Sequence, residues 1–331
     1  MQTPKPLPVE ITSLGACLPE RVLSNADLSE MVETTDEWIF PRTGIRERRL
    51  LAPEQATSDL AIVAAEQALQ QAGMNAADLD AILVATCSPD HLFPATACLV
   101  QAAIGATHAM ACDLEAACSG FLYALAWGGA ALTAGMVRNV LVIGAEALSR
   151  ITDYEDRRSC ILFGDGAGAA ILQPSSQGSE ILYAELGADG SWPEILMVPA
   201  GGSRLPASHE TVDARQHYMF LKGRDVFRLA VGKLAELIQR IPEATGIGLD
   251  DVKLVIPHQS NVRIVKSAFE RSGIDMSKAH MNIDRVGNTS AASIPLAMAE
   301  AAAAGEIERG DLVLLLAFGG GITWGSVLLR Y

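Results

Sequence analysis

Residues 118–147 read CSGFLYALAWGGAALTAGMVRNVLVIGAEA, and residues 288–321 follow the same design as NTSAASIPLAMAEAAAAGEIERGDLVLLLAFGGG. In each segment, a turn of small residues leads into an Ala-rich apolar helix, and an aliphatic strand follows after a polar link. Each helix stops at a glycine, Gly135 or Gly305, at the same offset from the start of its segment. The pattern therefore predicts two copies of one helix–strand unit.

The repeat extends upstream of both segments. Residues 70–87, QQAGMNAADLDAILVATC, and residues 243–258, EATGIGLDDVKLVIPH, each contain a helix end, a glycine, an Asp-rich turn and a buried strand. This alternation of helices and strands predicts an α/β protein of two similar halves, residues 1–180 and 181–331, with mainly parallel sheets covered by helices. The stretch at 175–215 has few periodic apolar residues and is interpreted as a linker and surface loop.

Composition excludes several classes of protein. The chain of 331 residues has a formal net charge of −14, whereas a nucleic-acid partner calls for a basic surface. The first residues contain no apolar signal segment, and the longest apolar stretch, 116–137, is interpreted as a buried helix because Ser119 and Thr133 interrupt it. We therefore expect a cytoplasmic protein with neither nucleic-acid nor membrane partners.

The six cysteines all lie in the first half, and no two form a C-x-x-C pair, so neither a zinc site nor a redox dithiol is expected. Their distribution fits a reducing compartment. Because free cysteines are often simply buried, five of them are interpreted as structural. These five are Cys17, Cys87, Cys98, Cys112 and Cys160.

Cys118 differs from the others in its place at the start of a predicted helix. It lies in DLEAACSGF, where a strand ends and the long apolar helix begins. The unpaired N–H groups and the positive dipole at a helix N-terminus favour the thiolate. Because the thiolate is the nucleophilic form of cysteine, the sequence predicts that Cys118 is a nucleophile.

His258 and Asn288 are the predicted partners of this cysteine. His258, in VIPHQSN, follows an aliphatic strand, and catalytic groups gather at the carboxyl ends of strands in open α/β sheets. Asn288, in VGNTSAAS, takes the place in the second half that Cys118 takes in the first. A pseudo-two-fold axis between the halves would bring both helix starts to one site. Asn288 could equally serve as an N-cap, and the two roles are compatible.

A glycine run follows the last aliphatic strand in AFGGGITWG, at Gly319 to Gly321. Three glycines allow the backbone to approach a ligand closely and to aim N–H groups at it. A tight turn is the alternative interpretation.

Six segments, in this order, resemble the β-ketoacyl-[acyl-carrier-protein] synthase III family of the thiolase superfamily. They are TDEWIFPRTGIRERR, AACSGF, ILFGDGAGAAIL, PHQSNVRI, GNTSAASIPLA and FGGGITWG. The resemblance covers nearly the whole chain. It implies a thiolase-like α/β fold of five layers, αβαβα, built from two duplicated halves, and a homodimer.

The resemblance implies an acyltransferase that condenses an acyl-CoA starter, acetyl-CoA in the first instance, with malonyl-[acyl-carrier protein]. The product would be a 3-oxoacyl-[acyl-carrier protein], the first step of type II fatty-acid synthesis. Cys118 would carry the acyl group, His258 and Asn288 would bind the malonyl thioester carbonyl during decarboxylation, and the N–H groups of Cys118 and Gly320 would form the oxyanion hole. No cofactor is implied, because coenzyme A arrives with the substrate.

The same resemblance assigns binding residues. Trp38, Arg42 and Arg157 would bind the adenine and phosphates of coenzyme A. Phe163 would line the active site, and the partner subunit would contribute Phe93 to the acyl pocket. Arg263, Arg228 and Lys266 would dock the carrier protein. The chain departs from the family pattern at Ser260, where alanine is usual, and at Glu270, where a basic residue is expected.

Other members of the superfamily fit the sequence less well. A thiolase needs a second cysteine in its C-terminal half, but none follows Cys160. Elongating synthases have a histidine where Asn288 stands. A specialised relative that condenses quinolone, branched or polyketide starters is the alternative reading. A non-catalytic binding module on this fold would lack the nucleophile, whereas this chain keeps Cys118.

Overall fold

The computed structural model describes residues 6–175 and 178–331 of the chain. The first half forms a five-stranded sheet with the strand order β1–β7–β6–β4–β5. Its strands are β1 (Val9–Cys17), β4 (Ala81–Ala85), β5 (Met110–Leu114), β6 (Val140–Glu146) and β7 (Gly166–Pro174). Helices α3 (Thr57–Ala72) and α4 (Thr96–Ile104) cover the outer face, and α3 packs on β1, β6 and β7.

The second half forms a four-stranded sheet with the order β11–β12–β13–β8. Its strands are β8 (Glu180–Ala188), β11 (Leu254–Pro257), β12 (Leu312–Gly319) and β13 (Thr323–Arg330). Helices α7 (Gly223–Thr245) and α8 (Val262–Ser272) cover its outer face. Where the first half has β5, the second has a single parallel bridge between Val255 and Ala279.

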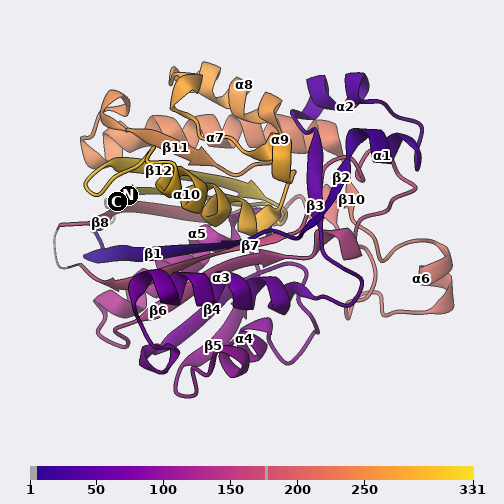
Figure 1. The fold of residues 1–331 in the computed structure, drawn as a ribbon. Helices are drawn as coiled ribbons and strands as arrows, with labels where there is room; N and C mark the ends of the chain where they lie inside the picture. Colours follow the sequence, from indigo (N-terminus) through magenta and orange to yellow (C-terminus); the bar gives the residue numbers. More distant parts are fainter. Residues whose placement is uncertain (1–5, 176–177) are drawn as a thin grey trace.

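Two apolar helices, α5 (Gly120–Thr133) and α10 (Ser293–Ala303), lie between the sheets. Their buried residues, among them Phe121, Leu125 and Met298, form one core cluster with strands of both halves. Each fully buried side chain of this size contributes about 1.5–3 kcal/mol to folding. Figure 1 shows the resulting order of layers, with α7 and α8 on one side and α3 and α4 on the other. The prediction of a five-layered thiolase-like fold is confirmed.

The glycine stops end both central helices as predicted. Gly135 and Gly305 each have a φ of +70°, the left-handed conformation that glycine adopts without strain. At each stop, the residue after the glycine donates its N–H to a carbonyl five residues back, from Met136 to Ala131 and from Glu306 to Ala301. This pattern satisfies carbonyls that the helix end would leave unpaired.

Two expectations about the sheets are wrong. Both sheets are mixed, because β7 runs antiparallel to β1 and β6, and β13 runs antiparallel to β12 and β8. No long crossover helix separates β12 from β13, so the chain simply turns back, and an antiparallel neighbour results. The expected linker at 175–215 also contains an ordered strand, β8, which pairs with β13.

When equivalent residues of the two halves are matched, the correspondence shifts by three residues near the site. Ala117 and Ser290 both have a φ of +45°, and each begins a 3-10 turn directly before its central helix. This match pairs Cys118 with Ala291, so the expectation that Asn288 mirrors Cys118 is wrong. The shift arises because α5 has 14 residues whereas α10 has 11, although both end at equivalent glycines.

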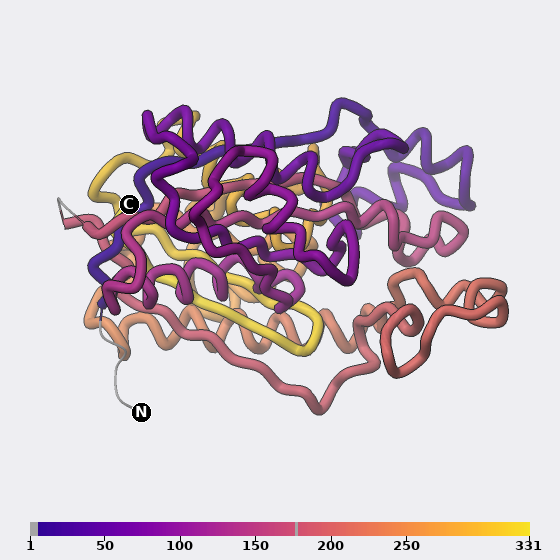
Figure 2. The backbone as a smooth tube through the Cα atoms, turned by 90° about the horizontal axis from the view of Figure 1, so that it is seen from below, coloured from indigo at the N-terminus to yellow at the C-terminus, as the bar shows by residue number. Residues whose placement is uncertain are grey.

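Smaller elements gather at one end of the molecule. They are β2 (Arg21–Ser24), α1 (Asn25–Ser29), α2 (Asp36–Thr43), β3 (Glu47–Leu50), β9 (Leu196–Met197), α6 (His209–Asp213), β10 (Phe220–Leu221) and α9 (Ile283–Val286). Figure 2 shows segments 21–50, 151–160 and 199–219 together at this end. Among the described residues, every helix is too short or too polar to cross a membrane.

Candidate active site

A cavity of about 530 Å³ opens at the edge where both sheets present the carboxyl ends of their parallel strands. Cys118, His258 and Asn288 all line it, as do Phe163 and Gly320. Most of the remaining wall is aliphatic and comes from α7, from β9 and β10, and from the loop before β7. The structure therefore brings the three predicted catalytic side chains into one apolar cavity.

Cys118 lies in the 3-10 turn Ala117–Ser119 that leads into α5, and it is 8% exposed. Thr323 Oγ1 donates a hydrogen bond of 2.7 Å to the carbonyl of Ala116 and so fixes this turn to the start of β13. Burial raises the pKa of Cys118 to about 12, and a hydrogen bond with Ser290 offsets only part of that rise. Burial thus disfavours the thiolate, which the start of a helix was expected to favour.

The glycine run brings the end of β12 against this turn. A Cβ atom at Gly319 would lie 2.7 Å from the backbone nitrogen of Cys118 and 3.2 Å from that of Ser119. Only glycine permits this approach. Gly320, the next residue, lines the cavity close to Leu196.

His258 follows β11 and is held at two points. Its backbone N–H donates to the carbonyl of Leu316 at 2.7 Å, and its Nδ1 lies 2.7 Å from the hydroxyl oxygen of Ser293. Burial lowers the pKa of His258 to about 3, because charge is disfavoured away from water. The imidazole is therefore neutral at pH 7, with one nitrogen that donates and one that accepts.

Asn288 is fixed by its backbone and by one side-chain bond. Its N–H donates to Leu162 at 2.8 Å, and its carbonyl accepts from Gly164 at 3.0 Å. The amide oxygen accepts the N–H of Ser290 at 2.9 Å. In the described part of the chain, the side-chain NH2 group has no protein acceptor, and it remains available to a ligand in the cavity.

Sequence reasoning missed a polar cluster beside the thiol. Glu146, at the end of β6, is fully buried and accepts hydrogen bonds from the side chains of Thr86 and Ser88, and from the N–H groups of Cys87 and Ala291. Burial raises the pKa of both Glu146 and Cys87. The position of Glu146 at the carboxyl end of a strand, the signal used for His258, could have revealed it.

The expectation that the five other cysteines are simply buried is wrong at two positions, Cys98 and Cys112, whereas Cys87 lies beside the site. Cys87 lines the cavity, and its Sγ lies 3.9 Å from the hydroxyl oxygen of Ser290, which also contacts Cys118. Cys98 and Cys112 are exposed. Cys160 is buried as expected.

Trp38, Arg42 and Arg157 form a cluster outside the cavity. The guanidinium carbons of Arg42 and Arg157 lie 4.7 Å and 5.3 Å from the centre of a Trp38 ring. Ion pairing with nearby acids would be the ordinary role of such surface arginines. Within the described residues, neither arginine forms such a pair.

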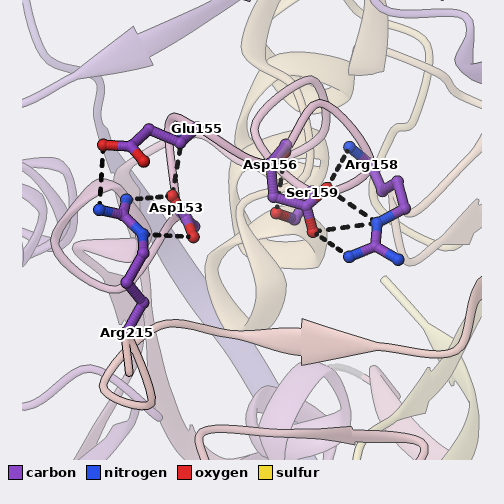
Figure 3. Close-up of polar contacts among 6 residues, drawn as sticks. All are labelled: Asp153, Glu155, Asp156, Arg158, Ser159 and Arg215. Carbon is purple, nitrogen blue, oxygen red and sulfur yellow. Dashed lines mark hydrogen bonds and ion pairs between the residues drawn. The ribbon is translucent and has the colours of Figure 1, made fainter. Parts of the chain in front are cut away.

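The acids next to Arg157 have other partners. Figure 3 shows Arg215 bonded to Asp153 and Glu155, and Arg158 bonded to Asp156. Arg157 instead donates to the backbone carbonyl of Glu33 at 2.9 Å. Its guanidinium therefore stays beside Trp38 with its charge not neutralised by a neighbouring carboxylate.

The remaining predicted residues lie on the surface. Phe93 is 86% exposed and is not part of the cavity wall within this chain. Arg228 and Arg263 are exposed, and Arg263 lies over the ring of Phe227, which lines the cavity. Lys266 is 3.9 Å from Glu270, so the residue that departs from the family pattern pairs with a predicted docking cation.

Within residues 6–175 and 178–331, no three His, Cys, Asp or Glu side chains gather as a metal site requires. The chemistry available in the cavity is that of a thiol, a neutral imidazole, a carboxamide and backbone N–H groups. Such a set suits acyl transfer, in which a sulfur attacks a carbonyl and hydrogen-bond donors stabilise the oxyanion.

Known proteins resemble this chain over its full length. Residues 112–190 match the family model described as 3-oxoacyl-[acyl-carrier-protein (ACP)] synthase III, and residues 243–331 match its C-terminal counterpart. The beta-ketoacyl-[acyl-carrier-protein] synthase III of Symbiobacterium thermophilum is 50% identical over 324 residues, 98% of each chain.

Solved structures agree. The 3-oxoacyl-[acyl-carrier-protein] synthase III of Aquifex aeolicus has a TM-score of 0.90 at 45% identity, covering 98% of this chain and 100% of its own. A priming beta-ketosynthase from the R1128 polyketide pathway has a TM-score of 0.89 at 30% identity, covering 99% and 98% of the two chains.

The layered fold and the thiol-containing cavity define a condensing acyltransferase of the thiolase type. Its curated relatives share about half of its residues along almost the entire chain. The chain belongs to the β-ketoacyl-[acyl-carrier-protein] synthase III family, whose condensation initiates fatty-acid synthesis. The alternative of a specialised enzyme is not favoured, because the polyketide relative is more distant, at 30% identity.

Proposed function

We propose that this enzyme joins an acyl-CoA starter, acetyl-CoA in the first instance, to malonyl-[acyl-carrier protein] and releases a 3-oxoacyl-[acyl-carrier protein]. The observation that carries the proposal is the convergence of Cys118, His258 and Asn288 on one apolar cavity. The cavity contains a nucleophile for the starter and two hydrogen-bonding side chains for the extender. Coenzyme A is a substrate in this scheme, and no cofactor takes part.

The first half-reaction is self-acylation. The sulfur of Cys118 attacks the thioester carbonyl of acyl-CoA, the carbon–sulfur bond to coenzyme A breaks, and the thiol proton of Cys118 ends on the departing coenzyme A. The N–H groups of Cys118 and Gly320 bind the oxyanion of the tetrahedral intermediate. Losing one such donor costs about 2.7–4 kcal/mol of barrier.

The second half-reaction is decarboxylation followed by condensation. His258 and Asn288 donate hydrogen bonds to the malonyl thioester carbonyl, so negative charge can build on that oxygen while carbon dioxide leaves. The resulting enolate attacks the acyl carbonyl on Cys118. The carbon–sulfur bond to Cys118 breaks, and the thiolate takes up a proton from solvent.

The surface cluster at Trp38 supplies the coenzyme A site in this proposal. An indole beside two guanidinium groups can stack on adenine and bind phosphates. Arg228, Arg263 and Lys266 are exposed cations that suit an acidic carrier protein.

Replacing Trp38 should weaken binding of the adenine end only. We expect Trp38→Ala to raise the KM for acetyl-CoA roughly 5- to 30-fold, the effect of one lost stacking contact of about 1–2 kcal/mol, with little change in kcat. Acetyl-pantetheine, which lacks the nucleotide, is the control and should react equally with both proteins. An equal rise in KM for both thioesters would show that Trp38 does not bind the adenine.

We further propose a homodimer. Leu92 and Phe93 are adjacent and almost fully exposed, and β5, with Met110 about half exposed, is the edge strand of the first sheet. Exposed apolar side chains beside an open strand edge are typical of a surface that another chain covers. In such a dimer Phe93 would reach the acyl pocket of the partner. All six cysteines are unpaired, which supports a cytoplasmic location.

The proposed function is tested with a panel of acyl-CoA starters, from acetyl to octanoyl and including branched chains, each combined with malonyl-[acyl-carrier protein]. We expect turnover with acetyl-CoA and release of one carbon dioxide per product. Comparable turnover with malonyl-CoA in place of the carrier would favour the specialised alternative. No condensation with any starter would refute the proposal.

A further inference from the structure

Among the described residues, the hydroxyl group of Ser293 is the only protein group that forms a hydrogen bond with the His258 side chain. Ser293 is the first residue of α10, and its Oγ lies 2.7 Å from Nδ1 of His258. Both residues are buried, at 1% and 4% exposure. Neither half-reaction described above uses Ser293.

The direction of this hydrogen bond follows from the need of the buried Ser293 hydroxyl for a hydrogen-bond acceptor. Among the described residues, Ser293 Oγ has no hydrogen-bond partner other than His258. If Nδ1 carried the proton, Ser293 would accept it and its own O–H would remain unsatisfied in the protein interior. A buried donor without a partner is strongly disfavoured. The favoured arrangement has Ser293 as donor and Nδ1 as acceptor.

We propose that Ser293 is a positioning residue that fixes the neutral His258 as the tautomer with its proton on Nε2. This inference rests on the proposed function, because its consequence concerns the malonyl half-reaction. With Nδ1 occupied by Ser293, Nε2 is the nitrogen left for a ligand. An Nε2–H group donates to a thioester carbonyl, whereas an unprotonated Nε2 would repel that oxygen.

The fixed tautomer of His258 should matter for decarboxylation but not for self-acylation. An Nε2 that already holds a proton cannot take one from the thiol of Cys118, so self-acylation does not depend on Ser293. Decarboxylation does depend on it, because the carbonyl needs the donor. Removing the hydroxyl leaves Nδ1 without a partner and lets both tautomers form.

The direct test is a two-bond ¹H–¹⁵N correlation spectrum of protein labelled with ¹⁵N-histidine, at pH 7. Signals missing from the spectrum of His258→Gln identify His258. We expect Nε2 to have the shift of a protonated nitrogen and Nδ1 that of an unprotonated one. A protonated Nδ1 in the unaltered protein would overturn the inference, whatever the enzyme's activity.

The kinetic test compares Ser293→Ala with Ser293→Thr, which keeps the hydroxyl. We expect Ser293→Ala to slow carbon dioxide release from the malonyl thioester about 3- to 10-fold, the equilibrium factor of one neutral hydrogen bond. Self-acylation by acetyl-CoA, followed by mass spectrometry, should change less than about twofold, within the spread of a peripheral substitution. Ser293→Thr should restore decarboxylation, and equal loss in both half-reactions would overturn the inference.

Ser13→Ala is the matched control. Ser13, in β1, is also 1% exposed and donates one hydrogen bond of 2.8 Å, but its partner is the carbonyl of Ala68 in α3, which does not line the cavity. A loss of decarboxylation in this variant equal to that of Ser293→Ala would assign the effect to general destabilisation and overturn the inference. Failure of the proposed function is recognised separately, because the unaltered protein would then neither acylate itself nor release carbon dioxide.

Discussion

Cys118→Ala should abolish condensation, with a loss of at least about 10³-fold, because the variant lacks the thiol that carries the acyl group. Incubation with acetyl-CoA should add one acetyl group to the unaltered protein and none to the variant, as read by mass spectrometry of the intact chain. Carbon dioxide release from malonyl-[acyl-carrier protein] should persist in the variant, because His258 and Asn288 remain.

Cys87 provides the control for this experiment. Its thiol lines the same cavity and contacts the same serine as Cys118, but it does not lie at the start of α5. Peptide mapping should place the acetyl group on residue 118, and Cys87→Ala should still form the adduct. An acetyl group on Cys87, or one that survives in Cys118→Ala, would contradict the assignment of the nucleophile.

Asn288→Ala should slow malonyl decarboxylation by about 10²- to 10³-fold, the usual effect of removing one donor from a developing oxyanion. The reason is the NH2 group, which is the part of this side chain that the protein leaves for a ligand. Self-acylation should fall far less. The two rates are measured as carbon dioxide release and as acetyl-protein formed over time.

Asn288→Asp separates this role from a structural one. The aspartate keeps an oxygen that can accept the N–H of Ser290, so the turn before α10 is preserved, but it has no NH2 group. We expect the same loss of decarboxylation as in Asn288→Ala. Retained decarboxylation in Asn288→Asp would show that the amide acts through the turn and not on the substrate.

Much of the fold could be predicted from local pattern. The helix–strand units, their glycine stops at Gly135 and Gly305, and the buried strands depend on short stretches of sequence. Strand direction does not, since β7 and β13 are antiparallel only because their connections lack a crossover helix. The ordered strand β8 was missed because its outer positions are only partly buried, which weakens the apolar signal.

The identity of the catalytic residues could be predicted from the sequence, but their burial and their pKa values could not. Position at strand and helix ends identified Cys118, His258 and Asn288. Burial is a property of the assembled halves, so the raised pKa of Cys118 and the lowered pKa of His258 could not be seen in the sequence. Ser293 was missed for a similar reason, because its partner His258 is distant in sequence.

Because α5 and α10 differ in length, the two halves of this duplicated molecule do not place the same chemical group at the site. In the second half, Ala291 stands at the position that corresponds to Cys118 in the first half. Its side chain lies so near the start of α5 that a Cβ atom at Gly120 would contact it. The second half supplies the amide and the imidazole, whereas the first supplies the sulfur. A substitution that removes a catalytic group from one half therefore cannot be compensated by the other half. Each half, expressed alone, would lack part of the catalytic set.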